Sequence, residues 1–208
     1  MKITAPKFIK RMMPELIWGL EDDERVFLTF DDGPTPGITE YILQQLDKYN
    51  AKATFFCLGK NVEMYPDLYE RIIAAGHKVG NHSYSHIKGW GRSEEEYVED
   101  VDFANQFVHS DLYRPPYGRI TSAQVKALAP RYRLIMWDVL SQDYNRNISP
   151  QKCLNKVLRH VKAGSVVVFH DSVKAYKNMY YALPRTLQYI KEQGLRCSTI
   201  ELWKGGGL

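Results

Sequence analysis

The chain has 208 residues, a length that favours one domain and is ample for a hydrophobic core. Hydrophobic residues make up 44% of it and charged residues 25%, and its net charge of +4 includes no block of Lys or Arg that would indicate nucleic-acid binding. No apolar stretch is long enough to cross a bilayer or to form the core of a signal peptide. We therefore expect a cytoplasmic protein without membrane insertion, unless a leader has been removed. The sequence does not define an oligomeric state.

Residues 1–25 are predicted to form an N-terminal arm packed on a single domain that spans residues 1–208. Pro6, Pro14 and Trp18 are typical of such a packed, extended segment.

From residue 26 onward, strand-like and helix-like segments alternate. Runs of β-branched and aromatic residues predict strands at 26–30, 53–57, 78–80, 112–114, 133–137, 165–169 and 197–200. Apolar residues at helical spacing, with capping residues at several ends, predict helices at 38–49, 62–75, 93–108, 121–129, 150–164 and 182–193. Gly76 and Gly164 are the predicted C-terminal ends of two of these helices.

This alternation predicts a parallel sheet, either open and doubly wound or closed into a barrel. Polar clusters favour the barrel because they follow five different strands: Asp31-Asp32, His82 with His86, Arg114, Asp138 with Asp143, and His170-Asp171. In a (β/α) barrel the carboxyl ends of the strands meet on one face, where active sites lie. The sequence thus predicts an α/β fold, a small and incomplete TIM-like barrel of about seven units.

Two adjacent acids, Asp31 and Asp32, follow an apolar run within the segment TFDDGPTPG. Like charges this close make each other costlier to ionise, so a compensating cation is expected nearby. The segment NHSYSH supplies His82 and His86 at a spacing that lets both imidazoles face one point. Two imidazoles and a carboxylate form a divalent metal site with positions open for water. If Asp32 is the ligand, Asp31 is free to accept a proton from that water.

Three further segments place polar groups after predicted strands. In RPPYG, Arg114 could pair with Asp31 and keep it ionised, and a backbone N–H of the rigid turn could face a developing oxyanion. In VVVFHDS, His170 is a candidate general acid for a leaving amine, although a lone histidine after an apolar strand is more often a core residue. In WDVLSQDY, either Asp143 or Asp138 could hydrogen-bond His170 and raise its pKa.

Taken together and in chain order, these five segments resemble the NodB-homology polysaccharide deacetylases, carbohydrate esterase family 4. The resemblance extends from about Val26 to Ile200. It implies a distorted (β/α) barrel and a metal-dependent hydrolase that removes N-acetyl, and sometimes O-acetyl, groups from a carbohydrate substrate. Zinc is the usual metal in this family, and cobalt, nickel and magnesium are alternatives.

The resemblance also implies roles for individual residues. Asp31 resembles the family's catalytic base, and His170 its catalytic acid. The other implied roles are those of Asp32, His82 and His86 as metal ligands, of Arg114 in orienting the base, of Asp143 in tuning the acid, of the Tyr117 backbone N–H in holding the oxyanion, and of Val168 in lining an acetate pocket.

The chain departs from the family pattern at Tyr144, where the family usually has Trp, and this changes the expected shape of the substrate groove. Trp137 is interpreted either as a core residue or as a substrate platform, so Trp137 and Tyr144 are both candidate substrate-binding residues. Most family members are exported. A cytoplasmic protein would instead act on a soluble precursor, a nucleotide sugar or recycled fragments.

The predicted function is the release of acetate from an amino-sugar oligomer, polymer or precursor, and other functions are weighed against it. A non-haem iron oxygenase also uses two His and one carboxylate, but the order of the ligands and the lack of an antiparallel strand pattern disfavour it. An amidohydrolase acting on a small non-sugar amide would share the barrel and the metal. A catalytically silent carbohydrate-binding protein would keep the fold but would need neither Asp31 as a base nor His170 as an acid.

Overall fold

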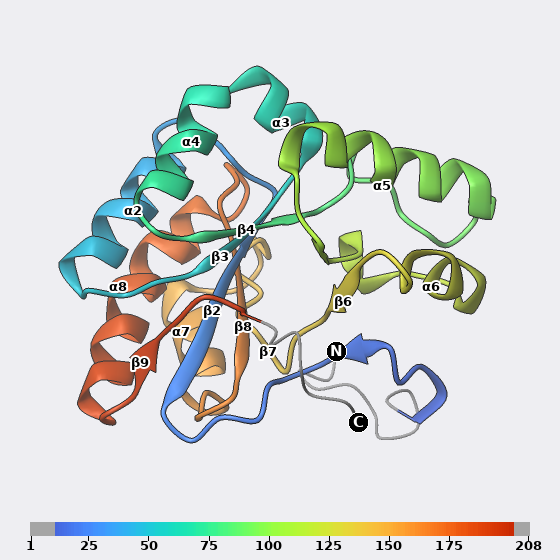
Figure 1. Ribbon diagram of the computed structural model, residues 1–208. Helices are drawn as coiled ribbons and strands as arrows, with labels where there is room; N and C mark the ends of the chain where they lie inside the picture. The colour runs from blue at the N-terminus through green and yellow to red at the C-terminus, as the bar shows by residue number, and fades with distance from the viewer. Residues whose placement is uncertain (1–10, 202–208) are drawn as a thin grey trace.

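The computed structural model describes residues 11–201, in which nine strands form a sheet whose described pairings are all parallel (Figure 1). The sheet has the order β1-β6-β5-β4-β3-β2-β8-β7, and β9 pairs with β2. The strands are β1 (Leu16–Ile17), β2 (Arg25–Asp31), β3 (Thr54–Cys57), β4 (Lys78–Asn81), β5 (Leu112–Tyr113), β6 (Arg133–Ile135), β7 (Val139–Leu140), β8 (Val166–His170) and β9 (Arg196–Cys197). The helices within the same range are α2 (Ile38–Lys48), α3 (Gly59–Met64), α4 (Pro66–Ala74), α5 (Glu94–Val108), α6 (Ser122–Leu128), α7 (Pro150–Leu158) and α8 (Tyr176–Glu192), with a short 3₁₀ turn at Pro116–Gly118.

The sheet is curled, as the connection between β6 and β7 requires. These strands lie near opposite ends of the sheet order, yet only Met136, Trp137 and Asp138 separate them in sequence. Four extended residue steps span at most about 14 Å, so the two ends of the sheet must approach each other. Met136 N donates to Ile17 O at 2.7 Å and Asp138 N donates to Val166 O at 3.3 Å, which ties the connection to both ends.

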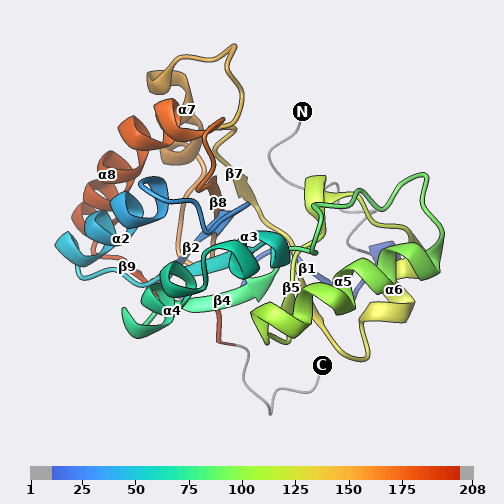
Figure 2. The same cartoon turned by 90° about the horizontal axis from the view of Figure 1, so that it is seen from above.

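The predicted fold, a distorted and incomplete TIM-like barrel, is confirmed. Within residues 11–201 no pairing joins β1 to β7, so the barrel is not closed by hydrogen bonds. Seen from above, the helices surround the curled sheet on its outer side (Figure 2).

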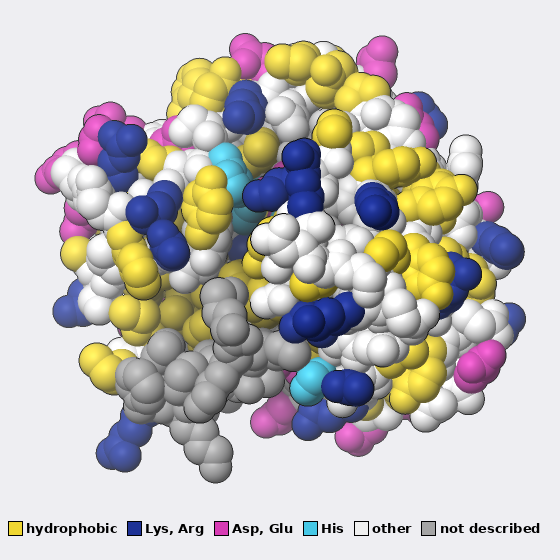
Figure 3. Space-filling view, turned by 180° about the vertical axis from the view of Figure 1, so that it is seen from behind, with side chains coloured by type: hydrophobic (Ala, Val, Ile, Leu, Met, Phe, Trp, Pro, Cys, Tyr) yellow, Lys and Arg dark blue, Asp and Glu magenta, His cyan; other side chains and the backbone are white. Residues whose placement is uncertain are grey.

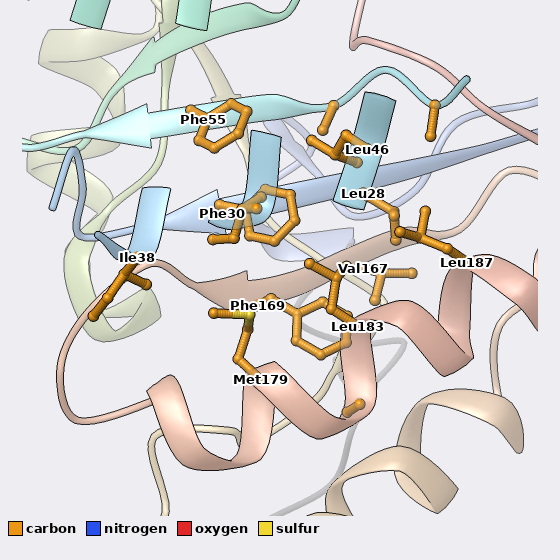
Figure 4. Close-up of a cluster of buried hydrophobic side chains, with 14 of the residues drawn as sticks. Leu28, Phe30, Ile38, Leu46, Phe55, Val167, Phe169, Met179, Leu183 and Leu187 are labelled. Atoms are coloured by element: carbon orange, nitrogen blue, oxygen red, sulfur yellow. The ribbon is translucent and has the colours of Figure 1, made fainter. Parts of the chain in front are cut away.

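Alternate residues of β2 serve different purposes. Leu28 and Phe30 point outward into a core shared with α2 and α8, where the Phe30 ring stacks on that of Phe55 at 5.0 Å between centroids. Figure 4 shows this core, with Phe169, Met179, Leu183 and Leu187 packed beside them. Thr29 and Asp31 point the other way, into the barrel, because side chains alternate along a strand. One face of β2 therefore packs against the apolar sides of the helices, and its other face carries polar side chains into the barrel.

The single helix predicted at 62–75 is wrong, because the structure has two helices there, α3 and α4. The break falls at Tyr65, whose backbone angles of φ −131° and ψ 56° are not helical. A proline disfavours the helical conformation of the residue before it, and Pro66 begins α4. Gly76 follows α4 with a φ of +76°, as predicted for a residue that ends a helix.

Two other helix limits also differ from the prediction. The helix starting at Pro150 ends at Leu158, and Gly164 lies in the turn before β8 with a φ of +80°. A Cβ at Gly164 would lie 2.2 Å from Leu20 O, so this glycine permits a close approach of two backbones.

Helix α8 begins at Tyr176 rather than at residue 182, and it contains Pro184 in its interior. Proline lacks the N–H that would bond the carbonyl four residues earlier, which is that of Tyr180. Tyr41 Oη donates to Tyr180 O at 3.1 Å, so a neighbouring helix supplies the missing donor.

The described part of the predicted N-terminal arm contributes β1, which pairs with β6, and Trp18 packs against Trp137 with ring centroids 6.4 Å apart. Pro6 lies outside the described residues. The strand predicted at 197–200 is shorter, as β9, and β7 was not predicted. None of the helices within residues 11–201 has the length and apolar character that a membrane span needs.

Candidate active site

The register of β2 and β8 brings the candidate base and acid together. Asp31 is the cross-strand partner of His170, and Thr29 is the partner of Val168. Paired residues of neighbouring parallel strands point to the same face and lie about 4.8 Å apart in the backbone. Asp31 and His170 therefore stand side by side at the carboxyl ends of two adjacent strands, facing into the barrel.

Arg114 is completely buried and holds Asp31. Its Nη1 donates to Asp31 Oδ1 at 2.6 Å and to Thr29 Oγ1 at 2.7 Å, and its other nitrogens donate to the carbonyl oxygens of Ile135 and Met136. Burial lowers the pKa of Arg114, but the Asp31 carboxylate opposes that effect. The pair leaves Asp31 Oδ2 without a hydrogen-bond donor among residues 11–201, available to accept a proton.

Asp32, His82 and His86 converge beside this pair. Their candidate ligand atoms all lie within 4.8 Å of one another. The Nε2 atoms of His86 and His82 lie 3.2 Å and 3.7 Å from Asp32 Oδ1, and the two imidazole centroids are 5.2 Å apart. The structure thus brings together the three residues that the sequence singled out as metal ligands.

The chemistry of these atoms fits a divalent metal. Asp32 Oδ1 is buried, yet no donor within the described part of the chain hydrogen-bonds it. His82 Nδ1 donates to Arg114 O at 2.8 Å, so its Nε2 presents a lone pair toward Asp32. Burial lowers the pKa of His82 to about 4, and the neutral imidazole is the form that binds metals. Burial would raise the pKa of Asp32, but the facing histidines His86, His170 and His82 hold it well below its usual range.

The two histidines lie on a tight loop rather than on a helix, and Ser83 and His86 both have a positive φ. Asp100, on α5, stabilises this loop by accepting two consecutive backbone N–H groups through its Oδ1, at 2.9 Å and 3.1 Å. Asn81 Oδ1 accepts the N–H of Ser83 at 2.7 Å. Sequence reasoning missed Asp100, because no local pattern links an acid on one helix to a loop that precedes it.

His170 is paired with Asp143 and not with Asp138. His170 Nδ1 donates to Asp143 Oδ1 at 2.8 Å, and the backbone N–H of His170 donates to Asp143 Oδ2 at 2.7 Å. Burial lowers the pKa of His170, but the Asp143 carboxylate outweighs that effect and raises it to about 9. Asp138 instead accepts from the hydroxyl of Ser165 and the N–H of Val166 at the start of β8. Of the two acids that the sequence left open, the structure places Asp143 against the histidine.

Tyr117 lies on the wall of the site next to His86. Its backbone φ is +60°, its hydroxyl lies 3.0 Å from His86 Nδ1, and the two ring centroids are 4.5 Å apart. Its backbone N–H donates to no acceptor within residues 11–201, so it is available to a ligand. Val168 is buried two residues before His170 on the same strand, and therefore faces the same side of the sheet.

Trp137 and Tyr144 each lie next to one residue of this group, Trp137 near Arg114 and Tyr144 against His170. Trp137 is half-buried, and its ring lies near the Arg114 guanidinium. The ring also packs closely on Gly118, because a Cβ added to that glycine would lie 2.6 Å from it. Much of the Trp137 side chain is therefore in contact with the protein. Tyr144 contacts His170 edge to face, with ring centroids 4.9 Å apart. Of the two candidate substrate-binding residues, Tyr144 is thus the one in direct contact with the acid.

Two buried side chains to which the sequence assigned no role position the catalytic loops. Asp171 Oδ2 accepts from Thr39 Oγ1 at 2.7 Å, and the same carboxylate fills the space where a Cβ on Gly33 would lie, at 1.8 Å. Burial raises the pKa of Asp171 to about 7. Asn178 Nδ2 donates to Asp143 O at 2.9 Å and so ties α8 to the loop that carries Asp143. The adjacent His170-Asp171 pair was the available signal for Asp171, whereas Asn178 had none.

Comparison with known proteins agrees with this geometry. The model of the polysaccharide deacetylase family matches residues 20–131, more than half of the chain. The chain is 32% identical over 192 residues to a peptidoglycan-N-acetylglucosamine deacetylase of Bacillus cereus, covering 88% of this chain and 90% of that protein. It is 30% identical over 181 residues to the peptidoglycan-N-acetylmuramic acid deacetylase PdaC of Bacillus subtilis, covering 84% of this chain and 38% of that protein. The chain belongs to the polysaccharide deacetylase family.

Solved structures show the same relationship. The Bc1960 peptidoglycan N-acetylglucosamine deacetylase matches with a TM-score of 0.85 at 30% identity, over 94% of this chain and 95% of that one. BA3943, a CE4 family pseudoenzyme from Bacillus anthracis, matches with a TM-score of 0.79 at 27% identity, over 89% of this chain and 67% of that one. The family and its relatives support a polysaccharide deacetylase enzyme with a carbohydrate substrate.

Proposed function

We propose that this protein is a metal-dependent hydrolase that removes N-acetyl groups from amino-sugar units of a peptidoglycan-type glycan and releases acetate. The observation that carries the proposal is the convergence of Asp32, His82 and His86 beside the paired Asp31 and His170. Two imidazoles and a carboxylate are a ligand set suited to zinc, and cobalt, nickel and magnesium are the alternatives. The relatives that act on peptidoglycan support the choice of substrate.

When bound, a divalent ion at this site would polarise the acetyl carbonyl and make a water molecule more acidic. Asp31 Oδ2 accepts the proton of that water as its oxygen attacks the carbonyl carbon, while Arg114 holds Oδ1 and keeps the carboxylate oriented. The free N–H of Tyr117 donates to the carbonyl oxygen as negative charge develops on it.

The second half of the reaction needs an acid. With its pKa raised to about 9, His170 carries a proton near neutral pH, and Asp143 holds that proton site in place through Nδ1. His170 Nε2 gives its proton to the leaving nitrogen as the C–N bond breaks, which yields acetate and the free amino sugar. One water is consumed for each acetyl group removed.

The test is the release of acetate by zinc-loaded and by chelated protein. The substrates are N-acetylglucosamine oligomers, peptidoglycan fragments, acetylated nucleotide sugars and simple acetamides. Metal-dependent acetate from a sugar substrate, lost in Asp31→Asn, supports the proposal. Activity on the nucleotide sugars would support action on soluble precursors. The cytoplasmic location expected from the sequence stays a prediction.

Two alternatives predict different results in the same assay. An amidohydrolase on small non-sugar amides would release acetate from acetamides only. A silent carbohydrate-binding protein would bind sugar oligomers and zinc without any release, and the similarity to the pseudoenzyme BA3943 gives this alternative a specific reason to be tested. The silent binding protein does not account for an acid and a base that are both in place beside the metal ligands, and the sugar-acting relatives disfavour the small-amide hydrolase.

A further inference from the structure

Trp90 is an exposed aromatic side chain on the segment that follows the candidate metal ligand His86. It follows His86 by four residues, and 55% of its surface is accessible to solvent. A tryptophan this exposed leaves a large apolar surface in contact with water, and exposed apolar surfaces commonly mark binding sites. The space-filling view shows histidine side chains at the surface beside hydrophobic side chains and Lys and Arg side chains (Figure 3).

Trp90 is not simply loose in solvent, because Arg119 holds its ring. The Arg119 guanidinium lies over the ring at 4.9 Å from the centroid, a cation–π contact. The backbones that carry the two residues are also joined, since Gly89 N donates to Arg119 O at 3.0 Å and Gln124 Nε2 donates to Gly89 O at 2.9 Å. A Cβ at Gly89 would lie 2.5 Å from Arg119 O, so only glycine permits this approach.

This pair is continuous with the candidate active site. Arg119 follows Tyr117 by two residues, and the Tyr117 ring packs on His86 and is 60% exposed. His86 with Tyr117 and Arg119 with Trp90 are thus two aromatic contacts that the same two chain segments, 86–90 and 117–119, carry side by side. The first contact serves the proposed chemistry, and the second, between Arg119 and Trp90, has no role in it.

We propose that Trp90, oriented by Arg119, is a sugar-binding subsite that stacks against the pyranose ring next to the unit being deacetylated. A pyranose presents an apolar face of C–H groups that can stack on an exposed indole ring. Because Arg119 already restricts the rotamers of Trp90, less side-chain entropy is lost when a sugar binds. The inference rests on the proposed function and makes it more specific, because the favoured substrate is an oligomer and not a single sugar.

The experiment compares wild type with Trp90→Ala, Trp90→Phe and Arg119→Gln on N-acetylglucosamine monomer and tetramer. We expect Trp90→Ala to lower the ratio of tetramer to monomer kcat/KM about tenfold, mainly through KM, with Trp90→Phe retaining most of it. Arg119→Gln should give a smaller loss in the same direction. Tyr180→Ala is the matched control, because Tyr180 is an aromatic residue of similar exposure, 48%, on α8, and it should leave the ratio unchanged.

Binding to the chelated protein gives a second readout that needs no turnover. Calorimetric titration with the tetramer should show Kd about tenfold weaker for Trp90→Ala than for wild type. Equal affinity in the two proteins, or an equal loss in Tyr180→Ala, overturns the subsite. Absence of acetate release by the wild type from every sugar would instead defeat the proposed function, and the titration would still decide the subsite.

Discussion

Replacing Asp143 by Asn should move the alkaline limb of the activity profile to lower pH. His170 must be protonated to act as an acid, so activity is lost as the pH rises through its pKa. Asp143 is the main reason that this pKa is raised to about 9, since burial alone lowers it. Asparagine has nearly the same shape and one oxygen that can accept the Nδ1–H, but it carries no charge, and its NH2 group would face the backbone N–H of His170. Because burial then opposes only the more distant Asp32 and Asp31, the pKa should fall toward its ordinary 6.5.

The size of the effect follows from these values. At pH 8, a group with a pKa of about 9 is roughly 90% protonated and one with a pKa of 6.5 is roughly 3% protonated, so kcat should fall roughly 30-fold. At pH 6 the same change should cost less than about twofold. The assay is kcat for acetate release between pH 5.5 and 9.5, with metal content verified at each pH.

Asp138→Asn is the matched control for this prediction. Its carboxylate accepts from Ser165 and Val166, so the variant should change stability without moving the alkaline limb. An Asp143→Asn profile with the wild-type alkaline limb would refute the reasoning, because either His170 is not the acid or Asp143 does not set its pKa.

Three further substitutions separate chemistry, metal binding and packing. Asp31→Asn should lower turnover by about 10²–10⁴-fold while one zinc per chain remains bound, and wild-type turnover would remove Asp31 from the role of base. His82→Ala should lose both zinc, measured by elemental analysis, and activity; stoichiometric zinc in the purified variant would exclude His82 as a ligand. Gly33→Ala should destabilise the protein by about 1–3 kcal/mol, seen as a lower Tm, because the added Cβ would overlap the Asp171 carboxylate. Gly19→Ala, whose Cβ would meet nothing nearer than 3.6 Å, should keep the Tm of the wild type, and equal Tm values for the two variants would contradict the overlap.

Local chemistry along the chain was sufficient for most of the fold. The apolar runs of β2 and β8 are buried whichever way they pair, and Ser93 with Glu96 forms a capping box at the start of α5. Proline limited the prediction in two places. Pro66 begins a new helix after a break that the continuing apolar pattern concealed, and Pro184 lies within α8, where Tyr41 supplies the missing donor.

The sequence by itself determined which side chains are available at the strand ends, because a parallel strand–helix alternation brings those ends to one face. Only the tertiary structure decided which of them touch. Asp138 and Asp143 are the same residue type and both follow the same predicted strand, so the sequence does not distinguish them. In the structure, the turn after β7 brings Asp143 to His170, whereas Asp138 accepts a hydrogen bond from the start of β8. The pairing of Asp31 with His170 depends on the register of two strands far apart in sequence, and the contact of Trp90 with Arg119 depends on two loops meeting at Gly89. Such contacts arise from the packing of the whole barrel, which no local pattern encodes.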